Sequence, residues 1–136
     1  ACEAFVQKHE LPVQFTGFLN QAKIVAAYVA ADCLVLPSDA GETWGLVVNE
    51  AMACGLTAII SDQVGCHTDL IVSGQTGWTY SLGNIDQLGD RLTTAIDLGS
   101  SGLTAMGKNA QQKVMAEYNY QKVVAGISQA LNFVCS

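Results

Sequence analysis

Two short runs dominated by apolar residues limit the fold of this chain more than any other feature. They are CLVLP at 33–37 and TAIIS at 57–61. Both lack the alternation of apolar and polar residues that a half-exposed strand shows, so they are typical of parallel strands covered on both faces. A helix-forming stretch lies between them, around residues 44–53, and Gly55 can end it. The order strand, helix, strand favours a parallel sheet with helices on both faces.

Further elements extend this pattern. VQFTG at 13–17 is predicted to be a short strand that Gly17 closes, and Asn20 is predicted to cap a helix over residues 21–30. GWTY at 77–80 is predicted to be a fourth, weaker strand. The fold class that follows is α/β, with a Rossmann-like parallel sheet and flanking helices.

The chain after Tyr80 is predicted to be helical only. Asn84, Ser101 and Asn119 can each cap a helix, and Gly99 separates the first of these helices from the second. We therefore expect a helical C-terminal tail.

Composition excludes several classes of function. The 136 residues suggest one domain, and 50% hydrophobic residues suit a buried core. A net charge of −6 disfavours nucleic-acid binding and attraction to an anionic membrane. Five cysteines without a CxxC pair favour a reducing, cytoplasmic setting, and two isolated histidines give no metal-ligand pattern.

Three loops follow the predicted strands, at 17–20, 37–44 and 61–69, and are rich in Gly, Ser and Asp. In parallel sheets, ligands collect at the carboxyl ends of the strands. The same residues also serve ordinary turns. Loop composition alone therefore leaves both interpretations open.

Glu50 is the most unusual residue of the predicted helix. Helical spacing gives it apolar neighbours at Leu46, Val47 and Cys54, where an unpaired carboxylate is costly. It needs hydrogen-bond donors, either within the fold, such as a backbone amide or a serine, or from a ligand with two neighbouring hydroxyls, such as a ribose. Glu42 lies in the loop before the helix, within reach of the same ligand.

The start of this helix adds an anion site. We expect free N–H groups at Trp44, Gly45 and Leu46, and Gly45 lets a ligand approach the backbone closely. Free amides together with the helix dipole favour a phosphate at this position.

These residues resemble the retaining glycosyltransferases of the GT-B fold, in the large group-one family. The family signature of two glutamates separated by seven residues is matched by Glu42 and Glu50. Gly45 after an aromatic residue, NEAMACG, SDQVG and VQFTGFLNQ match as well. The resemblance is close over residues 10–83 and looser over the helical tail.

The resemblance implies a partial C-terminal domain of a GT-B enzyme. Residues 1–136 would form the donor-binding domain without its first strands, and the acceptor domain would lie upstream in the same parent chain. The parent would take part in glycan biosynthesis, moving a sugar from a nucleotide-sugar donor to a glycan or lipid-linked acceptor with retained configuration. No cofactor or metal is implied, and any contact with the inner membrane face would come from the missing domain. This segment alone is expected to be inactive.

The resemblance also implies roles for single residues. Glu42 would act near the transferred carbon, and Glu50 would bind the ribose hydroxyls. The remaining donor contacts would come from backbone amides facing the phosphates and sugar, at Trp44, Gly45, Leu46 and Val47, and from backbone flanking the base, at Phe15, Thr16, Gly17 and Phe18.

The sequence departs from the family pattern in two regions. GCHTD at 65–69 lacks the usual paired glycines and glutamate, and no basic residue matches those that neutralise the donor diphosphate. Asp62 is interpreted as a turn residue, and His67 as a loop residue. Two alternatives remain open: a nucleotide-sugar epimerase of the same fold, and a non-catalytic module for nucleotide-sugar binding or assembly.

Overall fold

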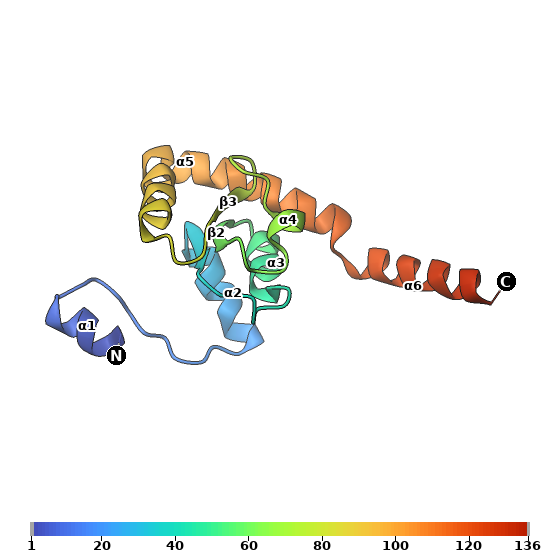
Figure 1. The fold of residues 1–136 in the computed structure, drawn as a ribbon, viewed down its shortest axis with the longest axis horizontal. Coiled ribbons are helices and arrows are strands. Elements are labelled where there is room, and N and C mark those ends of the chain that lie inside the picture. The colour runs from blue at the N-terminus through green and yellow to red at the C-terminus, as the bar shows by residue number, and fades with distance from the viewer. Residues whose placement is uncertain (1, 136) are drawn as a thin grey trace.

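Three parallel strands form the centre of the fold in the computed structural model, which describes residues 2–135 (Figure 1). They are β1 (Cys33–Leu36), β2 (Thr57–Ser61) and β3 (Gly77–Tyr80), in the order β1-β2-β3. Cys33 lies beside Thr57, and Ala58 lies beside Gly77. The predicted α/β class and parallel sheet are confirmed.

The middle strand is fully covered, as its apolar composition predicts. All five residues of β2 are buried. Ala58 and Ile60 belong to the core on one face of the sheet, and Ile59 belongs to the core on the other. This division follows from the alternation of side chains along a strand.

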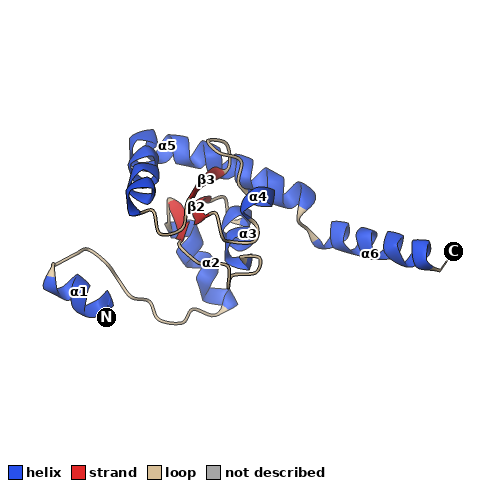
Figure 2. Ribbon diagram, viewed as in Figure 1, coloured by secondary structure: helices blue, strands red, loops and turns tan. Residues whose placement is uncertain are grey.

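Helices cover both faces, and Figure 2 shows them around the short strands. Val48 and Met52 pack on the Ala58 face, together with the end of the long helix over residues 85–117. The beginning and middle of that long helix cover Ile59 on the other face. The six helices described are α1 (Cys2–Lys8), α2 (Gln21–Ala30), α3 (Leu46–Ala53), α4 (His67–Leu70), α5 (Ile85–Glu117) and α6 (Tyr120–Val134).

A kink at Gly99 bends α5 sharply within its length. Gly99 has φ 68° and ψ 172°, which breaks the helical geometry inside α5 (Figure 1). A positive φ is accessible to glycine at little cost. The predicted division into two helices at Gly99 is therefore confirmed as a sharp bend within one long element.

The predicted helix ends are also present. The side chains of Asn20, Asn84 and Asn119 each accept a hydrogen bond from the amide three residues later, at 3.0 to 3.1 Å. These bonds satisfy donors that the first turn of a helix leaves free. Gly55 follows α3 with φ 86°, in the left-handed region.

The predicted strand at 13–17 is wrong. This segment is extended but forms no strand (Figure 2), and Val13 and Phe15 are about half exposed. A strand requires a neighbour that accepts its backbone hydrogen bonds, and no segment within residues 2–135 pairs with it. The helices α1 and α4 were not predicted; α4 is a single short turn in the loop after β2.

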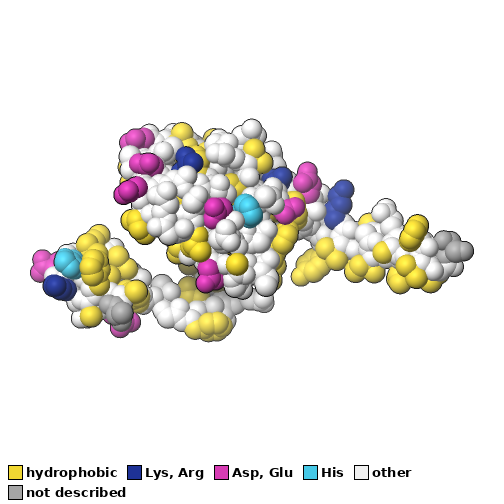
Figure 3. Space-filling view, viewed as in Figure 1, with side chains coloured by type: hydrophobic (Ala, Val, Ile, Leu, Met, Phe, Trp, Pro, Cys, Tyr) yellow, Lys and Arg dark blue, Asp and Glu magenta, His cyan; other side chains and the backbone are white. Residues whose placement is uncertain are grey.

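The two terminal helices differ from the body of the fold. α1 and α6 contain no buried residue and project away from the sheet in opposite directions (Figure 1). Apolar side chains lie along both of them (Figure 3), and Phe133 and Val134 are at least 80% exposed. Within residues 2–135, no helix has the length and apolar character that crossing a membrane requires.

Candidate active site

The two glutamates of the sequence motif lie on one short segment at the carboxyl edge of the sheet. Glu42 is in the loop after β1, and Glu50 is in the second turn of α3. α3 begins at Leu46, so the loop from Pro37 to Gly45 leads directly from the end of β1 into its first turn. This is the position at which parallel α/β sheets bind ligands.

Glu42 is held by backbone groups. Its Oε1 accepts a hydrogen bond from the amide of Gly45 at 3.0 Å, and its carbonyl accepts one from the amide of Gly65 at 3.2 Å. The carbonyl of Trp44 accepts a further bond from the amide of Cys66 at 2.8 Å. Two backbone hydrogen bonds, at Glu42 and at Trp44, therefore join the loop after β2 to the loop after β1.

The close approach of these two loops requires glycine at two positions. A Cβ atom on Gly65 would lie 1.9 Å from the carbonyl oxygen of Thr43, and one on Gly45 would lie 2.8 Å from Val64 Cγ1. Gly45 also has φ 96°, a conformation that side chains disfavour. The glycines noticed in the sequence thus serve packing between the loops.

The expectation of a free amide at Gly45 is wrong. That N–H group donates to Glu42, because the carboxylate lies three residues before the amide and folds back onto the helix start. The amides of Trp44, Leu46 and Val47 have no acceptor within residues 2–135. Leu46 and Val47 are the first helical residues, where the helix dipole favours an anion.

Glu50 does not lie in apolar surroundings, contrary to the prediction. Its side chain is exposed, because the face of α3 that carries it points away from the sheet. Oε2 accepts a hydrogen bond from the hydroxyl of Tyr28 on α2 at 3.0 Å, and Oε1 has no partner within the described residues. The fold thus supplies one donor for Glu50, and it is neither a backbone amide nor a serine.

Sequence reasoning missed Tyr28. It is 6% exposed and packs with Ala51 and Leu56. Burial, followed by the hydrogen bond to Glu50 and the charge of that residue, raises the pKa of Tyr28 from 10.0 to about 12. The signal in the sequence was a tyrosine among the small and aliphatic residues in the second half of α2.

Trp44 is a packing anchor. Its ring is partly buried, and its Nε1–H group donates to Asn49 Oδ1 at 2.8 Å. The ring centroid lies 6.0 Å from that of Tyr118, at the end of α5. The indole therefore ties the loop to α3 and to the C-terminal part of the fold.

The residues predicted to flank a nucleotide base lie apart from this cluster. Phe15, Thr16, Gly17 and Phe18 belong to the exposed segment before α2, and Phe18 is 94% exposed. Within residues 2–135, no hydrogen bond joins this segment to the loop after β1 or to α3. The structure thus brings together the predicted residues from Glu42 to Glu50, and it does not add the segment 15–18 to them.

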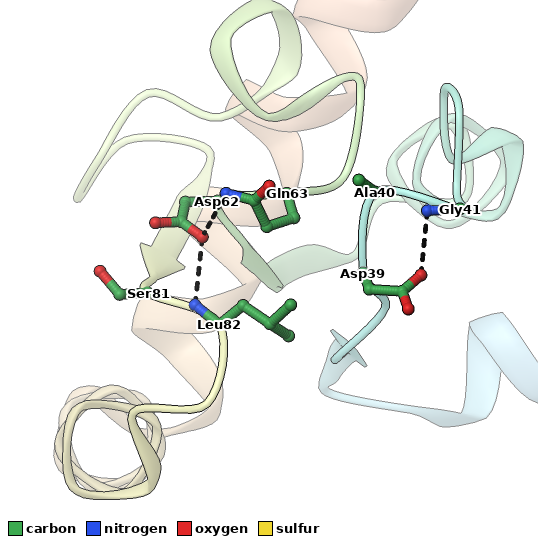
Figure 4. A pocket seen from close by; sticks show the side chains of 7 residues that line it. All are labelled: Asp39, Ala40, Gly41, Asp62, Gln63, Ser81 and Leu82. Carbon is green, nitrogen blue, oxygen red and sulfur yellow. Dashed lines mark hydrogen bonds between the residues drawn. The ribbon is translucent and has the colours of Figure 1, made fainter.

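An open hollow of about 470 Å³ lies beside these loops, where all three strands end (Figure 4). Asp62 Oδ1 accepts a bond from the amide of Leu82 at 3.1 Å, and this bond is the main cause of the lowered pKa of Asp62. Asp62 thus links the loops after β2 and β3 instead of forming a turn within its own loop. Asp39 does form such a turn, because its Oδ1 accepts a hydrogen bond from the amide of Gly41 at 2.9 Å.

The cysteine and histidine nearest the site are not arranged for nucleophilic or metal-dependent catalysis. Burial raises the pKa of Cys66 to about 11, which keeps the thiol protonated at neutral pH. His67 Nδ1 lies 2.9 Å from the carbonyl oxygen of Val64, so the ring is held against the backbone of its own loop. Among residues 2–135, no group of three or more His, Cys, Asp or Glu side chains could hold a metal ion.

Comparison with known proteins now identifies the family. The sequence profile of the family described as "Glycosyl transferases group 1" matches residues 2–113. The chain belongs to this family. The two glutamates, the glycine before α3 and the parallel sheet all lie within the matched region.

Two curated relatives illustrate the range of the family. The chain is 35% identical over 89 residues to the sulfoquinovosyl transferase SQD2 of Arabidopsis thaliana, covering 63% of this chain and 17% of the relative. It is 30% identical over 108 residues to the N-acetyl-alpha-D-glucosaminyl L-malate synthase of Bacillus anthracis, covering 79% and 28%. The chain thus spans less than a third of the length of either relative.

Two solved structures confirm the GT-B glycosyltransferase fold. The sucrose-phosphate synthase of Thermosynechococcus elongatus superposes with a TM-score of 0.84 at 28% identity, over 99% of this chain and 34% of the synthase. Anabaena HepE in complex with UDP gives a TM-score of 0.84 at 24% identity, over 96% of this chain and 35% of HepE, and at that identity it shows the fold alone.

Proposed function

We propose that this chain is the donor-binding part of an enzyme that transfers a sugar from a nucleotide-sugar to an acceptor with retention of configuration. One observation carries the proposal. In the sequence, the carboxylates Glu42 and Glu50 flank the amides of Leu46 and Val47 at the start of α3, which have no acceptor within residues 2–135. An anion site between two hydrogen-bond acceptors suits a diphosphate between a sugar and a ribose.

Each group has a part in this proposal. The amides of Leu46 and Val47 would stabilise the charge on the leaving diphosphate. Glu50 would accept hydrogen bonds from the ribose hydroxyls, and Glu42 would face the sugar near the transferred carbon. The exposed segment 15–18 would flank the base. We propose no metal for the reaction, since the sequence contains no Asp-x-Asp pair.

The relatives support sugar transfer over the alternatives. Both curated relatives described above are named for a transferase or a synthase, which favours transfer over epimerisation. HepE was solved with UDP, which makes a uridine diphosphate sugar the first donor to test.

We further propose that the complete enzyme contains additional strands, which pair with the free edge of β1, and a separate acceptor domain. β1 is at the edge of the sheet, and a hollow of about 480 Å³ lies beside it, lined by Val35, Ile59 and Leu92 among others. An apolar face beside an open edge suits further strands and helices of the same sheet. The added residues would also supply the basic groups for the diphosphate. The free thiols, two of them at partly buried positions, suit a cytoplasmic setting.

The test compares this chain with the full-length protein that contains it. Both are titrated calorimetrically with UDP-, ADP- and GDP-sugars and assayed for transfer, with the anomer of the product determined by NMR. A donor diphosphate carries about two negative charges, and a helix terminus supplies only about half a compensating charge. We therefore expect no transfer and weak or undetectable binding by the chain alone, and both activities in the full-length protein.

Three outcomes would contradict the proposal. Turnover by the chain alone at the full-length rate would show that the upstream residues are unnecessary. Conversion of the donor without any acceptor would favour an epimerase. Absence of binding of every nucleotide-sugar to the full-length protein would favour an assembly module.

A further inference from the structure

Tyr28 is a core residue that presents its only hydrogen-bond donor to a surface carboxylate. Its ring lies between α2 and α3, against Ala51 and Leu56, and is 6% exposed. Its hydroxyl donates to Glu50 Oε2 at 3.0 Å. Glu50 itself is exposed, so this bond is what connects its side chain to the rest of the fold.

The bond limits where the carboxylate of Glu50 can be. A free glutamate on a helix surface samples many rotamers, and these are lost when a ligand fixes it. The phenol cannot move with the side chain, because its ring is held in the core. Glu50 Oε2 is therefore fixed beside Tyr28 before any ligand arrives, and binding loses less side-chain entropy.

The same bond leaves the carboxylate able to accept a diol. Glu50 Oε1 has no partner within residues 2–135, and an ionised carboxylate offers about four acceptor positions over its two oxygens. Oε2 can therefore accept a ligand hydroxyl beside that of Tyr28. Two neighbouring hydroxyls on adjacent carbons match the two oxygens.

The hydroxyl of Tyr28 remains a hydrogen-bond donor across the physiological pH range. Burial and the adjacent Glu50 carboxylate raise the pKa of Tyr28 to about 12, and the charge of Cys54 acts in the same direction. The phenol therefore keeps its proton wherever the protein functions.

We propose that Tyr28 is a positioning residue for ribose recognition, which orients the carboxylate of Glu50 toward the vicinal diol without itself touching the ligand. This inference rests on the proposed function, because it concerns the ribose that Glu50 is proposed to bind. α2 also begins at Gln21, shortly after the segment 15–18, which is proposed to flank the base. One helix would thus link the base and ribose ends of the nucleoside site.

The experiment measures discrimination between ribose and deoxyribose. The full-length protein is titrated with UDP, ADP and GDP and with the 2′-deoxy counterpart of each, and the ratio of the two Kd values is compared. Tyr28→Phe keeps the ring and removes the hydroxyl. We expect the affinity for the ribonucleotide to fall about tenfold, the scale of one hydrogen bond to a charged group. The affinity for the deoxynucleotide should change by less than about twofold, so the ratio falls.

The controls separate positioning from folding. Tyr80→Phe removes another buried tyrosine hydroxyl, in the core on the opposite face of the sheet, and should leave the ratio unchanged. The double variant Tyr28→Phe/Glu50→Gln should discriminate no less than Glu50→Gln alone, because Tyr28 acts through Glu50. If Tyr28→Phe does not fold, replacing Tyr28 by 4-fluorophenylalanine fills the volume of the hydroxyl without donating a hydrogen bond.

The outcomes distinguish this inference from the proposed function. If Glu50→Gln loses discrimination and Tyr28→Phe keeps it, the positioning role is wrong and the proposed function stands. An equal loss of both affinities in Tyr28→Phe would also overturn the role, since that is what a merely structural tyrosine would cause. If the wild type binds no nucleoside diphosphate, or binds ribose and deoxyribose forms equally, both proposals are wrong.

Discussion

The two glutamates of the motif are held in different ways by the same short segment. Glu42 is bonded through its carboxylate to Gly45 and through its carbonyl to Gly65, so backbone groups of two loops fix it. Glu50 is bonded through its carboxylate to one side chain, the hydroxyl of Tyr28. One carboxylate is therefore positioned by loop geometry and the other by a residue on a neighbouring helix.

This difference teaches where each region is vulnerable. Hydrogen bonds between backbone groups survive most changes of side chain. They depend instead on how closely the two loops can approach each other. The Glu42 region should therefore be sensitive to substitutions of glycine. The Glu50 region should instead be sensitive to the loss of single polar groups, which leave the backbone in place.

The largest effect is expected from Gly65→Ala. The new Cβ would lie 1.9 Å from the carbonyl oxygen of Thr43, so the two loops must separate. We expect a loss of about 1–3 kcal/mol in the free energy of unfolding, the usual cost of overpacking, measured by denaturant titration. Transfer by the full-length protein should fall with it, because Glu42 moves.

Gly89→Ala is the matched control for Gly65. Gly89 lies in α5, where a Cβ would meet nothing within 4 Å. Its replacement should stabilise the fold by about 0.4–1 kcal/mol. Equal stability of the two alanine variants would show that close contact between the loops does not hold Glu42 in place.

The next effect concerns the charge of Glu42. Glu42→Gln keeps an oxygen that can accept from Gly45, so stability should change little. Transfer in the full-length protein should fall by about two orders of magnitude, the scale for removing one stabilising group from a reacting centre. Affinity for the bare nucleoside diphosphate should stay nearly unchanged, since Glu42 is proposed to face the sugar. An equal loss of diphosphate affinity would contradict this division between the two glutamates.

Glu50→Gln should show the opposite pattern. Loss of the charge should lower nucleoside diphosphate affinity by about 1–3 kcal/mol, while folding suffers less. Glu117→Gln is a suitable control, because Glu117 is exposed at the end of α5 and forms an ion pair with Lys113 at 3.8 Å, away from the site. A severe loss of stability with unchanged nucleotide affinity would mean that Glu50 serves the fold alone.

The sequence was sufficient to predict the parts of the molecule that local rules determine. Apolar runs predicted β1 and β2, and asparagine side chains predicted the starts of α2, α5 and α6. These features depend on residues close together in the chain. The same reasoning failed for 13–17, because β-favouring residues form a strand only where a neighbour accepts their hydrogen bonds.

The site was predictable in composition and less so in contacts. The spacing of Glu42 and Glu50 placed one just before a helix and the other within it, as the structure shows. Their partners come from elsewhere: Gly65 lies 23 residues after Glu42, and Tyr28 lies 22 residues before Glu50. Sequence spacing cannot show which distant segments contact each other, so neither partner was foreseen.

The smallest expected effect is a loss of stability in alkali, which differs between the Glu42 and Glu50 regions and is absent at neutral pH. Burial raises the pKa of Cys66, beneath Gly45, from 9.0 to about 11, and that of Tyr28 from 10.0 to about 12. Both groups are neutral when protonated, and a raised pKa means that the folded state holds the proton more tightly. Their contribution to stability is therefore complete below the unfolded pKa and is lost as the pH rises through the folded pKa. The Glu42 region should weaken between about pH 9 and 11, and the Glu50 region between about pH 10 and 12.

Hydrogen exchange is too fast at these values, so the measurement is denaturant unfolding at successive pH values. Cys66→Ala should flatten the profile above pH 9, and Tyr28→Phe only above pH 10. Identical profiles for the wild type and both variants would show that neither buried group contributes to the loss of stability in alkali.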